Sequence, residues 1–121
     1  MAATNAAIKQ ANNAMKKLNG AVNAQRQAEA GVNVSGNLTK MNAGYDGAAA
    51  GFKNAAQKMN SINMGQVAKN FNNAAKAAEA ASAVKAARAG KNALNALTNA
   101  MLVNQRNMNA GKPPTTPAGV V

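Results

Sequence analysis

The amino-acid sequence predicts an all-α protein, with three to four amphipathic helices followed by an extended, proline-containing C-terminal tail. Alanine, the residue with the highest helix propensity, supplies 32 of the 121 residues. Apolar residues recur at alternating intervals of three and four, the heptad-like period of helices that pack along a narrow seam. The three prolines all lie beyond residue 112, in a segment without periodicity. We therefore place the helical region at residues 1–109 and the tail at residues 110–121.

The first helix is predicted over residues 4–30. Its apolar seam consists of Ile8, Ala11, Met15, Leu18 and Val22. Lys9 and Lys16 fall on the opposite side of the helical wheel, so the segment is amphipathic. The stretch GVNVSGN, residues 31–37, then interrupts the pattern with two glycines and β-branched residues.

The second helix is predicted over residues 37–62 and has the strongest regularity in the chain. Its seam steps by three and four residues without an error and consists of Leu38, Met41, Tyr45, Ala48, Phe52, Ala55, Met59 and Ile62. This period, sustained for about three and a half heptads, is typical of a coiled-coil-like contact. The stretch NSINMGQ, residues 60–66, ends the helix at Gly65.

The rest of the helical region is predicted as two segments, residues 66–89 and 91–108. The first carries Phe71 and a row of alanines, and the second carries Leu94 and further apolar residues at helical spacing. Because glycine weakens a helix interior, we place the boundary between the segments at Gly90. The pattern leaves open whether they are two helices or one kinked helix.

Three glycines of the second segment, Gly44, Gly47 and Gly51, form a strip beside the seam residues Tyr45 and Phe52 on the helical wheel. Each glycine costs about 1 kcal/mol relative to alanine in a helix interior. A strip without side chains lets a neighbouring backbone approach closely, so we predict that these five residues take part in helix packing. The alternative is that the helix kinks at the stretch GYDG and that the spacing is accidental.

Large apolar side chains are scarce, whereas the net charge is high. Leu, Ile, Val and Phe total 17 residues, and the net charge is +11. This combination falls within the compositional range of chains that do not fold alone. We therefore expect the protein to become ordered on assembly, with other copies of itself or with other proteins as partners.

The residue types present exclude most chemistry. The chain contains no His and no Cys, and its three acids, Glu29, Asp46 and Glu79, lie on different segments. Acid–base catalysis, nucleophilic triads and metal sites need several such groups to converge. We therefore expect no enzymatic activity, no catalytic, cofactor-binding or metal-binding residue, and no small-molecule substrate. Each acid is expected to accompany a nearby lysine, as Glu79 accompanies Lys76.

The positive charge favours an anionic partner, either nucleic acid or an anionic membrane surface. Most lysines are dispersed, but Lys85, Arg88 and Lys91 form a row and are the candidate phosphate contacts. One Tyr, two Phe and no Trp leave little material for stacking on bases. Any contact with nucleic acid is therefore expected to be electrostatic and independent of sequence. The alternative is that these cations only keep an alanine-rich surface soluble.

The chain resembles small internal, ejection or minor structural proteins of bacteriophage virions. The features behind the resemblance are helices rich in Ala, Asn and Gln, such as NAAIKQANNAMKKLNGAVNAQRQAEA, together with the absence of Cys and His, the basicity and the proline-containing tail. The resemblance implies a non-enzymatic structural or assembly protein, packaged with the genome or bound to the head–tail apparatus of a virion.

Two other functions remain open at the level of sequence. One is a sequence-independent DNA-binding or condensing protein, and the other is a membrane-active amphipathic helical protein. No apolar run approaches the ~20 residues of a membrane span, and the N-terminal residues lack the apolar core of a secretory signal. Outside a virion, the expected location is therefore cytoplasmic.

Overall fold

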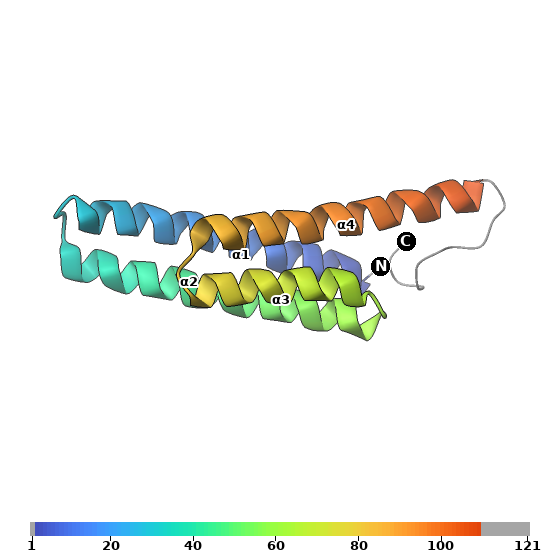
Figure 1. Ribbon diagram of the computed structural model, residues 1–121, viewed down its shortest axis with the longest axis horizontal. Coiled ribbons are helices and arrows are strands. Elements are labelled where there is room, and N and C mark those ends of the chain that lie inside the picture. Colours follow the sequence, from blue (N-terminus) through green and yellow to red (C-terminus); the bar gives the residue numbers. More distant parts are fainter. Residues whose placement is uncertain (1, 110–121) are drawn as a thin grey trace.

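The computed structural model describes residues 2–109, and the predicted tail, residues 110–121, lies outside the described residues. Four helices pack as a bundle: α1 (Ala2–Glu29), α2 (Val34–Ser61), α3 (Gly65–Glu79) and α4 (Ala83–Asn109). Each helix runs antiparallel to the one before it, and α4 packs beside α1 as well as α3 (Figure 1). The predicted all-α fold is confirmed.

The three connections between the helices close in the same way. The residue that reverses the chain has a left-handed backbone in each: Gly31 (φ 79°), Asn63 (φ 60°) and Ala81 (φ 56°). The residue after it donates its amide hydrogen to the carbonyl oxygen five positions back, at 2.9 Å in all three connections. This is the Schellman arrangement, which satisfies carbonyl groups at the end of a helix. It explains why each helix can be followed at once by an antiparallel neighbour.

The boundary between the third and fourth helices differs from the prediction. The ranges 66–89 and 91–108 placed this boundary at Gly90, whereas α3 already ends at Glu79. This region is nevertheless two separate antiparallel helices, α3 and α4, rather than one kinked helix. The predicted boundary was wrong because the chain reverses at Ala81, a residue type that gives no turn signal, while Gly90 lies inside α4.

The face of α1 that is buried consists mostly of small side chains. Its buried residues are Thr4, Ala7, Ala11, Ala14, Leu18, Ala21 and Ala24. The larger residues of the predicted seam, Ile8, Met15 and Val22, are only partly buried. The predicted seam is therefore confirmed at Ala11 and Leu18 only. The buried face is shifted toward alanines, because periodicity gives weight to large side chains whereas a close approach of two helices buries small ones.

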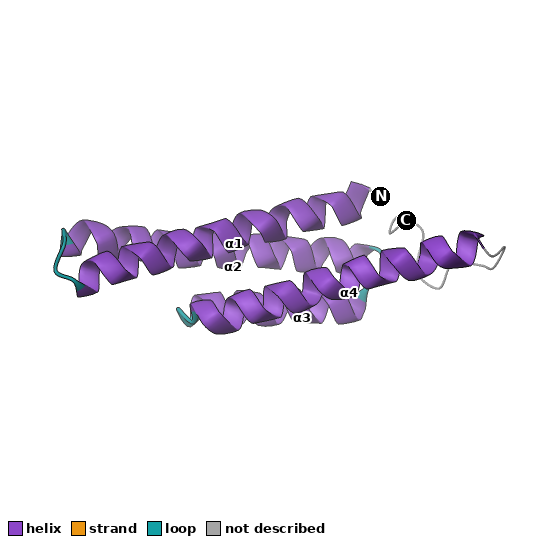
Figure 2. Cartoon of the chain, turned by 90° about the horizontal axis from the view of Figure 1, so that it is seen from above, coloured by secondary structure: helices purple, strands orange, loops and turns teal. Residues whose placement is uncertain are grey.

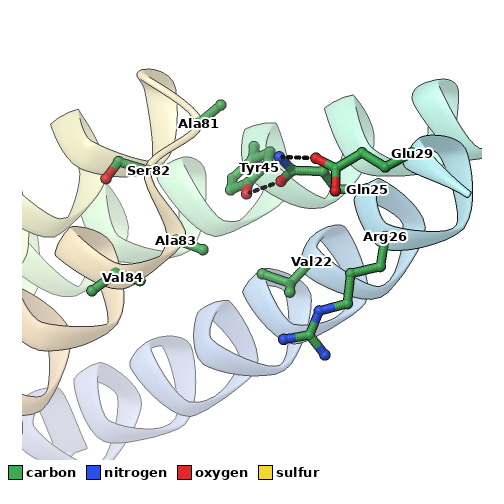
Figure 3. Close-up of a pocket in the computed structure, with 9 residues that line it drawn as sticks. All are labelled: Val22, Gln25, Arg26, Glu29, Tyr45, Ala81, Ser82, Ala83 and Val84. Atoms are coloured by element: carbon green, nitrogen blue, oxygen red, sulfur yellow. Dashed lines mark hydrogen bonds between the residues drawn. The ribbon is translucent and has the colours of Figure 1, made fainter.

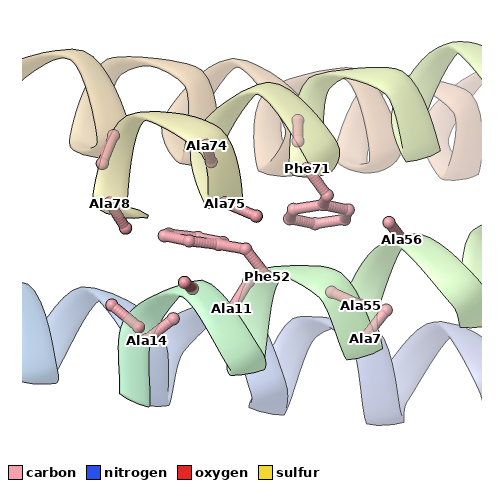
Figure 4. Close-up of a cluster of buried hydrophobic side chains, with 14 of the residues drawn as sticks. Ala7, Ala11, Ala14, Phe52, Ala55, Ala56, Phe71, Ala74, Ala75 and Ala78 are labelled. Carbon is pink, nitrogen blue, oxygen red and sulfur yellow. The ribbon is translucent and has the colours of Figure 1, made fainter. Parts of the chain in front are cut away.

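On α2 the predicted seam is buried from Tyr45 to Met59. Its largest member, Phe52, is completely buried and stacks against Phe71 of α3, with the ring centroids 6.4 Å apart and the ring planes inclined by 24°. Alanines of α1, α2 and α3 surround the two rings (Figure 4). This aromatic pair joins the two hairpins of the bundle, because the first ring belongs to α2 and the second to α3.

The α3–α4 hairpin covers only part of the longer α1–α2 hairpin. α3 has 15 residues against 28 in each of α1 and α2, and the α3–α4 loop lies beside the middle of the longer hairpin (Figures 1 and 2). At this point Val22 and Tyr45 line a groove together with Ala83 and Val84. We name the part beyond it, residues 23–44, the hairpin tip. It consists of two helical segments and their loop, and beyond the groove no other described helix lies beside it (Figures 1 and 2).

Candidate functional site

The glycine strip of α2 faces α1, and Gly44 is the member that comes closest to the α1 backbone. A Cβ atom at this position would stand 2.8 Å from the Cβ of Ala21 and 2.9 Å from the carbonyl oxygen of Lys17. Gly47 differs, because the atom nearest to its Cβ position would be the Cδ of the Lys17 side chain, at 2.8 Å. The backbone of α1 cannot move aside as the long side chain of Lys17 can. Glycine is therefore required at residue 44, whereas at residue 47 a larger residue could be accommodated if the lysine moved.

Gly51 repeats the close contact one heptad further along α2. A Cβ atom there would stand 3.1 Å from the Cβ of Ala14 and 3.2 Å from the carbonyl oxygen of Gln10. α2 is one unbroken helix through all three glycines, so the alternative of a kink at the stretch GYDG is wrong. The neighbour that approaches is α1 of the same chain. The strip therefore closes the hairpin and is not a free docking surface.

Sequence reasoning missed a further close-packed glycine, Gly90 of α4. A Cβ atom there would stand 2.8 Å from Cε1 and 2.9 Å from Cζ of Phe52, and 3.2 Å from Sδ of Met15. Gly90 lies on the same helix face as Ala86 and Ala93, both of which are completely buried. That placement on a buried alanine row was the signal that could have identified it. The glycine makes room for the aromatic ring at the centre of the bundle.

Tyr45 lies at the boundary between the covered part of α2 and the hairpin tip. It is buried, and its hydroxyl donates a hydrogen bond to Oε1 of Gln25 at 3.2 Å. Nε2 of the same glutamine donates to Oε1 of Glu29 at 3.3 Å (Figure 3). The three polar groups thus form a short chain that ties α2 to the last two turns of α1.

A groove of about 330 Å³ opens at this boundary. It is lined by Val22, Gln25, Arg26, Glu29, Tyr45, Ala81, Ser82, Ala83 and Val84 (Figure 3). The side chain of Val84 is 70% exposed. The ionisable side chains of the lining are one carboxyl, one guanidinium and one phenol, without a second carboxyl or a nucleophile and base in contact. The groove therefore offers hydrogen bonds and apolar contact.

An uncovered apolar row runs along the α2 side of the hairpin tip. Among the described side chains, five large apolar ones are exposed: Val32, Val34, Leu38, Val84 and Leu102. The first three belong to the tip. Leu38 stands one heptad before the buried Tyr45, and the partly buried Met41 stands one heptad before the buried Ala48. The seam that packs against α3 in the covered half of α2 therefore continues into the tip, where Met41 still packs against the core but Val34 and Leu38 are largely uncovered.

The candidate phosphate contacts Lys85, Arg88 and Lys91 are all exposed on α4. The sequence of α4 contains no Asp or Glu, so no carboxylate of the same helix neutralises them. Their spacing of three residues turns them progressively round the outer side of the helix, away from the buried row of Ala86, Ala93 and Leu97. The three cations therefore form a spread basic surface rather than a pocket for a single anion.

The acid at the end of α3 has a different partner from the one expected. Glu79 forms an ion pair with Lys53 of α2, not with Lys76 of its own helix. The packing of α3 against α2 brings Lys53 across the interface, which a reading of one helix alone does not predict. Both side chains are about half exposed, so the pair contributes little to stability.

The part of the chain that the structure describes contains no group of three or more His, Cys, Asp or Glu residues that could hold a metal ion. Among the same residues, no helix is both long enough and apolar enough to pass through a bilayer. Comparison with protein-family models, with curated proteins and with solved structures gives no significant match.

Proposed function

We propose that the protein is a non-enzymatic structural protein that acts by assembly with other helical protein, as an internal, ejection or head–tail component of a bacteriophage virion. The observation that carries the proposal is the uncovered apolar row of the hairpin tip. Val34 and Leu38 are 44% and 43% exposed although they stand on the same seam as the completely buried Phe52.

Exposure of these apolar side chains to water is unfavourable in free energy. Burying a Val or Leu side chain fully is favourable by about 1.5–3 kcal/mol, so covering a half-exposed one contributes about 1 kcal/mol. A partner that lies along Val34 and Leu38 would gain this at each position. Assembly through the tip is therefore favourable without any chemistry at the site.

The placement in a virion is supported by composition: long helices rich in Ala and Asn, a net charge of +11 and no Cys or His. Mass spectrometry of purified phage particles tests it directly, and we expect this chain among their proteins. Leu38→Asn should lower its incorporation, whereas Leu102→Asn, which changes an equally exposed leucine on α4, should not. Absence of the wild-type chain from the particles would overturn the placement.

A second candidate function, sequence-independent binding of DNA, is favoured by the exposed cations of α4. Lys85, Arg88 and Lys91 stand on a helix without carboxylates. Phosphate contacts need positive charge along a surface and no defined pocket, which matches this arrangement. The two functions are compatible, because the basic surface lies on α4 and the apolar row lies on the tip.

A further inference from the structure

We infer that the partner that covers the hairpin tip is a second copy of this chain, so that two tips pack face to face about a twofold axis. The inference rests on the proposed function, since it names the partner of the same apolar row. It commits to a symmetric contact, in which the row of one molecule covers the row of the other.

The covered half of the molecule shows which structural element packs on the α2 seam. There, the α1–α2 hairpin packs against another antiparallel helix pair, α3–α4 (Figures 1 and 2). The hairpin tip is itself an antiparallel helix pair, and its α2 side carries apolar residues, Leu38 and Met41, one heptad before the buried Tyr45 and Ala48. Two tips laid together therefore repeat, between molecules, the four-helix arrangement that already exists within each one.

The distribution of charge permits this contact between two strongly basic molecules. The tip carries Arg26, Glu29 and Lys40 and therefore has a net charge of +1, whereas the whole chain has +11. Most of the positive charge thus lies outside the region that would be shared. Contact through the tips brings the two least charged parts together and keeps the basic parts apart, which limits the electrostatic repulsion.

Sedimentation equilibrium of the full chain over a wide concentration range tests the inference. We expect the wild type to be in monomer–dimer equilibrium. Leu38→Asn should raise the dimer dissociation constant at least about tenfold, because each of the two copies loses one apolar contact. Leu102→Asn, the matched control at the far end of α4, should leave the constant unchanged. Circular dichroism of each variant establishes that the helices are intact.

A cross-linking experiment locates the contact independently. The chain contains no Cys, so Leu38→Cys and Leu102→Cys each introduce one thiol for a short bismaleimide. Covalent dimers from residue 38 and not from residue 102 support the inference. A wild type that is monomeric at every concentration overturns it, and so does a dimer that Leu38→Asn leaves unchanged. Neither of these results removes the proposed function, because incorporation of the chain into particles through another protein is measured separately.

Discussion

Gly44 of α2 lies so close to Ala21 of α1 that a Cβ atom on the glycine would stand 2.8 Å from the Cβ of the alanine. Real Cβ atoms do not approach one another to this distance, so the two helices are nearer than any larger pair of residues would permit. The helix loses about 1 kcal/mol of propensity at the glycine. In return, the backbones of α1 and α2 make close van der Waals contact over a long interface that contains few large side chains.

We expect Gly44→Ala and Gly47→Ala to change stability in opposite directions. At residue 44 the new methyl group meets the backbone of α1, and overpacking of this kind costs about 1–3 kcal/mol, which outweighs a propensity gain of about 1 kcal/mol. At residue 47 it meets only the flexible side chain of Lys17, so most of the propensity gain remains. Urea unfolding of both variants, followed by circular dichroism, measures the two signs. Stabilisation by both substitutions would contradict the close approach of the backbones.

We expect Gly90→Ala to destabilise the bundle by about 1–3 kcal/mol, because the methyl group displaces the ring of Phe52. The conservative change Phe52→Leu removes the ring atoms that the methyl group would meet. The double variant should therefore lose less stability than the sum of the two single variants, by at least about 0.5 kcal/mol. A double-mutant cycle in urea measures this difference, and simple additivity would show that residues 52 and 90 do not share the space.

We expect Ala81→Gly to raise the free energy of unfolding by about 0.5–1 kcal/mol. A left-handed backbone costs a non-glycine residue about 1–2 kcal/mol, and the greater freedom of glycine in the unfolded chain offsets part of the relief. The control is Ala50→Gly, an exposed position inside α2, where glycine should destabilise by about 1 kcal/mol. Thermal melts of both variants compare the two effects. A loss of stability at residue 81 would mean that the turn does not hold this conformation in solution.

If the chain binds DNA, replacement of Lys85, Arg88 and Lys91 by Gln should lower the slope of log affinity against log salt by up to ~3 units, about one for each phosphate contact. The control variant replaces Lys40, Lys58 and Lys69, which changes the net charge equally but on α2 and α3. Fluorescence anisotropy with duplexes of two unrelated sequences measures both slopes. Equal slopes for the two variants would remove α4 as the binding surface, and a marked preference for one duplex would contradict sequence-independent binding.

The sequence by itself determined the features that depend on residues close along the chain. Helix propensity and the three-and-four spacing identified an all-α chain. The same spacing also predicted the buried residues from Tyr45 to Met59, because which residues share one face of a helix depends on that helix alone. The glycine strip beside that run was also visible, because its position on the wheel is a property of α2.

The tertiary structure decided which faces meet and where the chain turns. Gly44 admits α1 of the same chain, and no local pattern could name that neighbour. The burial of alanines rather than Ile8 and Met15 depends on the distance between the helix axes, which is set by both helices together. The reversal at Ala81 places alanine in a backbone conformation that it avoids locally, and the packing of α3 and α4 on α1 and α2 compensates for it. The uncovered hairpin tip could not be predicted from the sequence either. It exists because α3 ends halfway along α2, and that endpoint depends on the reversal at Ala81.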